Sequence, residues 1–212
     1  MKDKIISICQ SSDEDLNSER VSNIEKLVKN NLQEIYDTED KKIILSLLYC
    51  LQIKGFYSVI DPIILFTAKI IKENPKYWGL NEGGVPGERM YRYIVSSIGS
   101  AIKVIGLNEE LTYKYSEYII DNIIVASNDS PLCSSFLYAL AKNKDARAHA
   151  VLKRYLMNSI NLFNSDIFKA IAIYKDKDDL FLLEKYIDGN HLDEFNARLH
   201  SDAKAAIKKI QN

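Results

Sequence analysis

Apolar residues recur every three or four positions along most of the chain, which is the spacing of helices that bury one face. One clear stripe is Val21, Ile24, Val28, Leu32 and Ile35. Alternation at every second position, the pattern of half-buried strands, is nearly absent. The pattern therefore predicts an all-α protein.

Capping residues and helix breakers divide this pattern into about ten helices. We expect them near residues 18–35, 38–53, 61–74, 88–105, 108–126, 130–141, 146–157, 165–174, 178–188 and 202–211. Asp61-Pro62 and Ser130-Pro131 indicate helix starts, since a cap followed by proline suits a helix N-terminus. Asn108 is a further expected cap. Connections are short with one exception and no low-complexity linker is present, so the sequence predicts a single domain over residues 1–212, built from about five antiparallel helix pairs.

One segment of the chain repeats itself at a constant offset of 31 residues. Ala139-Leu140-Ala141, Asp145 and Leu152-x-x-Tyr155-Leu156 return as Ala170-Ile171-Ala172, Asp176 and Leu183-x-x-Tyr186-Ile187. A weaker upstream copy has Ala101-Ile102, Asn108 and Tyr115-x-x-Tyr118-Ile119, where the offset to the next tyrosine widens to 37. A period of this size with helical spacing indicates stacked helix pairs.

The string Ala139-Leu140-Ala141-x-x-x-Asp145-x-Arg147-Ala148, followed by an apolar helix, resembles the HEAT-repeat family, particularly its phycobilisome-lyase-like branch. The match covers roughly residues 100–210 and is faint before them. The resemblance implies a right-handed α-solenoid that binds proteins along a concave face. The chain departs from the family where Asp176-x-Asp178 replaces Asp-x-Arg, so we expect an irregular array with a broken Asp–Arg ladder. The alternative is a generic helical bundle whose alanines and leucines repeat by chance.

Composition excludes several other classes of protein. The formal net charge is −1 and the pI is near 6.3, so nothing favours binding to nucleic acid or to an acidic membrane. The most apolar stretch, residues 59–71, contains Asp61 and Lys69 and cannot span a bilayer. Cys9, Cys50 and Cys133 are odd in number and far apart, which is typical of reduced thiols. With no export signal, these features predict a cytoplasmic protein.

Two segments are candidate partner-binding surfaces. The first is the long connection over residues 74–87 and the helix start after it, which are rich in aromatic and arginine side chains that commonly anchor interfaces. Its candidate residues are Tyr77, Trp78, Arg89, Tyr91 and Arg92. The second segment, residues 11–40, is rich in acidic residues and could bind a basic partner. Its candidate partner-binding residues are Asp37, Glu39 and Asp40. The alternatives are a connection in which Trp78 closes the core, and a solvated first helix pair.

The sequence predicts no catalytic residue, metal site or cofactor. His149 stands alone between two alanines, where a packing or surface role is expected. Asp176-Lys177-Asp178-Asp179 lacks the glycine and glutamate that complete a calcium loop. A second group of polar residues fits no familiar metal-ligand spacing: His191, Asp193, Glu194, His200 and Asp202. The related tyrosines Tyr118, Tyr155 and Tyr186 are expected to pack in the core.

These observations favour a non-enzymatic protein-binding solenoid. A bacterial immunity protein that neutralises a toxin, such as a basic nuclease domain, is one concrete form. One alternative is a HEAT-like DNA glycosylase or other nucleic-acid-binding protein, in which Trp78, Arg89 and Arg92 would hold a strand, although the pI argues against it. Another is a scaffold subunit of a larger complex. No small-molecule substrate is evident.

Overall fold

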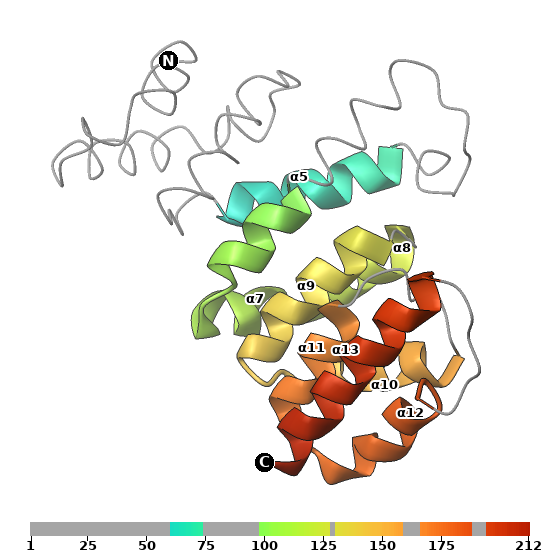
Figure 1. The fold of residues 1–212 in the computed structure, drawn as a ribbon. Helices are drawn as coiled ribbons and strands as arrows, with labels where there is room; N and C mark the ends of the chain where they lie inside the picture. The colour runs from blue at the N-terminus through green and yellow to red at the C-terminus, as the bar shows by residue number, and fades with distance from the viewer. Residues whose placement is uncertain (1–59, 74–97, 128–129, 159–165, 188–193) are drawn as a thin grey trace, which may run out of the picture. The chain divides into compact units, whose positions relative to one another are not determined.

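A computed structural model of the protein describes residues 60–73, 98–127, 130–158, 166–187 and 194–212 (Figure 1). Within these ranges the chain forms helices, turns and short connections and no strand, so the all-α prediction is confirmed for them. The chain divides into two compact units, Met1–Ile105 and Gly106–Asn212, and each is described by itself. No helix in the described ranges is both long enough and apolar enough to cross a membrane.

The described part of the first unit consists of α5 (Ile60–Glu73) and a helix over residues 98–105. α5 begins at Ile60, next to the predicted Asp61-Pro62 start, and ends just before Asn74-Pro75. Its buried face includes Ile60 and Ile64. The buried Thr67 hydroxyl donates to the Ile63 carbonyl at 2.7 Å, which satisfies a polar side chain on an otherwise apolar face.

The second unit opens with α7 (Glu109–Ile119), which continues without a break through η4 (Ile120–Ile124) and α8 (Val125–Ser127). Asn108 is the predicted cap, and its side-chain oxygen accepts from the Leu111 N–H at 2.7 Å. η4 is a π-helical turn that sequence reasoning did not anticipate. Its reason is a buried stripe that repeats every four residues, because a wider turn keeps such a stripe on one face: Leu111, Tyr115, Ile119, Ile123 and Ser127.

The remaining elements are α9 (Ser130–Lys142), α10 (Ala146–Asn158), α11 (Asp166–Tyr174), η5 (Lys177–Asp179), α12 (Leu180–Glu184) and α13 (Glu194–Gln211). Four of the predicted starts, near residues 130, 146, 165 and 178, are close to these bounds. The prediction for the last helix was wrong, since α13 begins at Glu194 and not near residue 202. The buried positions Leu199, Ala203, Ala206 and Ile210 form one stripe that begins before Asp202, which therefore lies inside the helix and does not cap it.

The helices of the second unit form two layers. α11 packs against both α9 and α13, and α10 packs against both α7 and α12 (Figure 1). α10 also contacts α9 and α11, so the two layers share one core. Phe136 of α9 and Phe168 of α11 are the largest of its fully buried side chains. The offset between the upstream copy of the repeat and the next copy is 37 residues and not 31, because the upstream copy contains a longer helix. Glu109–Ser127 is one continuous helix, whereas the equivalent helix α10 has 13 residues.

Two of the predicted core features lie within this unit and are confirmed. Cys133 is a buried free thiol whose sulfur donates to the Ile124 carbonyl at 3.2 Å. Tyr155 is buried, and its burial raises the pKa of its hydroxyl. Tyr186 is half-buried, packs edge-on against Phe168 with ring centroids 5.3 Å apart, and donates to the Leu156 carbonyl at 2.9 Å. Tyr118 is also half-buried.

The 31-residue repeat is present in the backbone conformation as well as in the amino-acid sequence. Lys144 and Lys175, one repeat apart, each adopt a left-handed backbone with φ of 54° at the end of a helix. The next residue in each copy, Asp145 or Asp176, accepts a backbone N–H two positions on at 3.0 Å. The turns after α9 and α11 therefore have the same construction.

The two turns differ in how their aspartates are paired with cations. Arg147 lies 3.0 Å from Asp145 and 3.3 Å from Glu117 of α7. Burial raises the pKa of Asp145, but hydrogen bonds from Arg147 and from the Ala148 N–H outweigh it and leave the pKa lowered. In the second turn Asp178 replaces the arginine, and Lys153 of α10 pairs with Asp176 at 2.9 Å. The cation that pairs with Asp176 thus comes from the preceding helix pair and not from the turn itself.

Replacing Lys144 with glycine is expected to raise the free energy of unfolding by about 1 kcal/mol, and the same holds for Lys175→Gly. A residue with a Cβ loses about 1–2 kcal/mol in the left-handed region, more than glycine loses in backbone entropy. Urea melts would measure both changes. Lys204→Gly, at an exposed position inside α13, is the matched control and should cost about 1 kcal/mol. Destabilisation by Lys144→Gly would contradict the assigned turn.

Candidate functional site

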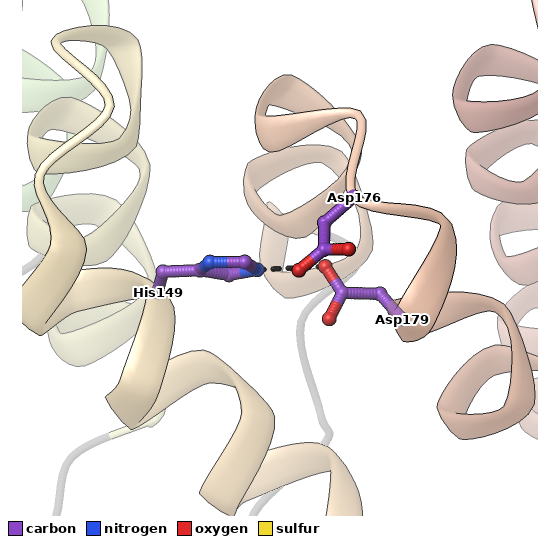
Figure 2. Close-up of side chains that lie close together, drawn as sticks. All are labelled: His149, Asp176 and Asp179. Carbon is purple, nitrogen blue, oxygen red and sulfur yellow. Dashed lines mark hydrogen bonds and ion pairs between the residues drawn. The ribbon is translucent and has the colours of Figure 1, made fainter.

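One histidine and two aspartates from neighbouring helix pairs meet in the second unit (Figure 2). His149 lies in the first turn of α10. Asp176 caps η5, and Asp179 is the last residue of η5, directly before α12. The ligand atoms of the three side chains all lie within 4.8 Å of one another. The cluster therefore joins α10 to the junction between α11 and α12.

The ring of His149 is fixed on two sides. Its Nε2 lies 2.7 Å from Oδ2 of Asp179, in a hydrogen bond whose donor depends on the tautomer. Its face stacks on Tyr174, with ring centroids 4.0 Å apart and planes 6° from parallel. The Tyr174 hydroxyl in turn donates to the Asp145 carbonyl at 2.7 Å, and burial raises the pKa of that hydroxyl. The imidazole is thus held in position before any ligand arrives.

Lys153, one helical turn after His149, supplies the positive charge of the cluster. Its Nζ lies 2.9 Å from Oδ2 of Asp176 and 3.0 Å from Oδ1 of Asp179. The hydrogen bond to Asp176 raises the pKa of Lys153 and lowers the pKa of Asp176. One ammonium thus serves two carboxylates, so the cluster carries one net negative charge while His149 is neutral.

Asp179 is the unusual member, because its side chain is 0% exposed. Its Oδ1 is paired with the Lys153 ammonium and its Oδ2 with Nε2 of His149. One repeat earlier the same position is Ala148, and in the upstream copy it is Leu111; both are buried and apolar. A buried carboxylate at a core position of a repeat costs stability. The repeat alone does not account for Asp179, which marks the cluster as the candidate site.

The structure corrects the expectation for His149, which does not stand alone. The partners come from the next repeat, so no short motif contains them. A signal was nevertheless present in the sequence, because the 31-residue offset aligns Asp179 with Ala148 and so places an acid among apolar positions. Of the other polar group, His200 and Asp202 are half-buried on α13 and form no ligand cluster among the described residues. His191 and Asp193 lie outside those residues.

The predicted partner-binding residues all lie outside the described ranges and stay predictions: Tyr77, Trp78, Arg89, Tyr91, Arg92, Asp37, Glu39 and Asp40. The structure instead shows a different exposed feature. Tyr113 of α7 and Phe181 of α12 are 88% and 61% exposed, unusually high values for aromatic side chains. Between them in repeat register lies Ala150 of α10, which is also exposed. We call Tyr113, Ala150 and Phe181 the aromatic row.

Comparison of the chain with protein-family models, with curated proteins and with solved structures finds no match. Membership of the HEAT family therefore stays a prediction that rests on the repeated residues.

Proposed function

We propose that this protein is a non-enzymatic, protein-binding α-solenoid of the HEAT type, right-handed and built from about five helix pairs. The observation that carries the proposal is the aromatic row, in which three equivalent positions on α7, α10 and α12 are all exposed. In a stacked array, equivalent positions of neighbouring repeats face the same way and form a continuous surface.

The chemistry of the row suits a protein partner. Large exposed aromatic rings are costly on a free surface and are the residues that most often anchor interfaces. Neighbouring packed helices lie about 8–10 Å apart, so the two rings would flank the small Ala150 at about that distance on either side. This arrangement gives a partner two apolar anchors with space between them.

Charged residues border the aromatic row on both sides. Three residues before the members of the row lie Glu110, Arg147 and Asp178. Four residues after them lie Glu117, Arg154 and Lys185. All six side chains are exposed. An apolar centre within a rim of mixed charge is the usual composition of a protein interface. A uniformly basic rim would have favoured nucleic acid instead.

An immunity protein that neutralises a cognate toxin is the concrete form of this proposal. A dedicated single partner would contact the aromatic row. The Trp78 connection and the acidic residues Asp37, Glu39 and Asp40 stay separate candidate surfaces. A scaffold subunit would use the same surface for a permanent neighbour. Strand binding by a glycosylase-like protein would not need the row.

The test compares partners captured from the native cell by the wild-type chain and by Phe181→Asp. Loss of an aromatic anchor and burial of a charge should weaken the affinity for the captured protein by more than about tenfold in calorimetry. Val125→Asp, at a 53% exposed apolar position outside the row, is the matched control and should bind normally. Equal affinity of Phe181→Asp and wild type would rule out the row, and capture of nucleic acid at low salt would favour the glycosylase-like alternative.

A further inference from the structure

We propose that His149, Asp176 and Asp179 form a binding site for a divalent zinc ion. The inference concerns residues outside the aromatic row and does not depend on the proposed function. It rests on the donor set, on the burial of Asp179 and on the rigid support of the histidine.

The donor set is one imidazole nitrogen and two carboxylate oxygens, all of which zinc accepts. The three atoms lie within 4.8 Å of one another, whereas the ligands of one tetrahedral zinc ion lie about 3.4 Å apart. The separation of 2.7 Å between Nε2 of His149 and Oδ2 of Asp179 would widen as the ion enters between them. Rotation of the Asp179 carboxylate would supply this movement while the stacked imidazole stays in place. Three protein ligands would leave a fourth position for water.

Asp179 supplies the second, independent observation. Its carboxylate is completely buried and directed into the cluster, where Oδ2 faces His149 and Oδ1 faces the Lys153 ammonium. The equivalent residues Ala148 and Leu111 show that the repeat packs well with an apolar side chain there. A buried acid is costly in a purely structural role, whereas a cation site requires a carboxylate that faces the ion.

The surrounding residues hold the ligands as supporting shells of metal sites do. Tyr174 stacks on the imidazole and is itself anchored to the Asp145 carbonyl. Asp176 is oriented by the Asp178 N–H, which donates to its Oδ1 at 3.0 Å and leaves Oδ2 directed at the cluster. Such contacts fix ligand orientation before the ion binds and commonly change metal affinity 10–100-fold.

The Lys153 ammonium lies where the zinc ion would bind, since it is within 3.0 Å of the carboxylates of Asp176 and Asp179. Zinc and the ammonium would compete for the same two oxygens. The Lys153 side chain is 30% exposed and long, so its charge can move to solvent when the ion enters. Removing this charge should therefore strengthen zinc binding.

A bound ion would couple two neighbouring helix pairs. His149 directly precedes Ala150, and Asp179 lies two residues before Phe181. Zinc would therefore fix the separation between α10 and α12 at the level of the aromatic row. We assign the ion this cross-linking role.

The experiment titrates zinc chloride into the full chain after removal of metals with EDTA, and follows the heat of binding and the melting temperature. Wild type should bind one zinc ion per chain and melt at a higher temperature. Lys153→Met should bind at least tenfold more tightly. His149→Ala should bind at least tenfold more weakly, while His200→Ala, the control on α13, should match wild type.

Circular dichroism of each variant without metal checks that the helices remain folded. Absence of zinc binding by wild type overturns the proposal. So does binding by His149→Ala that equals wild type, because the ion would then lie elsewhere. Cobalt substitution gives a readout independent of stability, since a tetrahedral site with one nitrogen and oxygen ligands has visible absorption bands that His149→Ala should lose.

Discussion

Replacing Phe168 with alanine is expected to lower the free energy of unfolding by about 4 kcal/mol. The side chain is 0% exposed in the first turn of α11, the helix that packs against both α9 and α13. Truncation removes apolar surface from the core and leaves a cavity beside Tyr186, and such changes typically cost about 3–5 kcal/mol. Urea denaturation followed by circular dichroism measures the loss.

Phe181→Ala is the matched control for this prediction, because it makes the same chemical change at a 61% exposed position of the next helix. Its effect on stability should stay within about 0.5 kcal/mol. A similar loss in both variants would contradict the division into a buried α11 and an exposed aromatic row. A small effect of Phe181→Ala on stability would also show that the loss of this ring does not unfold the protein.

Replacing Lys153 with methionine is expected to lower the free energy of unfolding by about 3 kcal/mol, measured in EDTA. Methionine keeps most of the apolar stem but removes the ammonium that faces Asp176 and the buried Asp179. The carboxylate of Asp179 then keeps only His149 as a polar partner. Leaving a buried charge without its ion-pair partner typically costs about 3–5 kcal/mol, and His149 offsets part of that cost.

The same substitution should be much milder when Asp179 is alanine. In that background the buried charge is gone, so Lys153→Met should cost less than about 1 kcal/mol. The neighbouring variant Asp178→Ala removes an exposed acid and should leave the full effect of Lys153→Met in place. Equal effects of Lys153→Met with and without Asp179 would show that the ammonium does not stabilise this carboxylate.

The helices were predictable because their signals are local. Asn108 caps α7 and Asp145 caps the start of α10 through side-chain oxygens only three residues from the backbone N–H groups that donate to them. The repeated turn was predictable for the same reason, since one sequence pattern at two places gives one backbone conformation at Lys144 and Lys175. At the start of α13 the prediction was wrong, because the buried stripe begins at Leu199, before the predicted boundary near residue 202.

The cluster was not predictable from motifs, because His149 and Asp179 come from different helices and meet only after packing. The π-helical turn of η4 was not predicted for a related reason, because no single residue indicates it and only a long buried stripe requires it. The repeat register would have shown the anomaly at Asp179, and it also aligns Tyr113 with Phe181. Register therefore carries more information here than any local motif.

Site-specific photo-crosslinking in the native cell would show whether the aromatic row contacts a dedicated protein partner. A photo-reactive phenylalanine analogue would replace Tyr113, Phe181 or, as the control on α13, the exposed Lys204. We expect the first two positions to crosslink to one and the same protein, and the third to give no such product. Crosslinking of that protein from Lys204 alone, or no product from either aromatic position, would contradict the account.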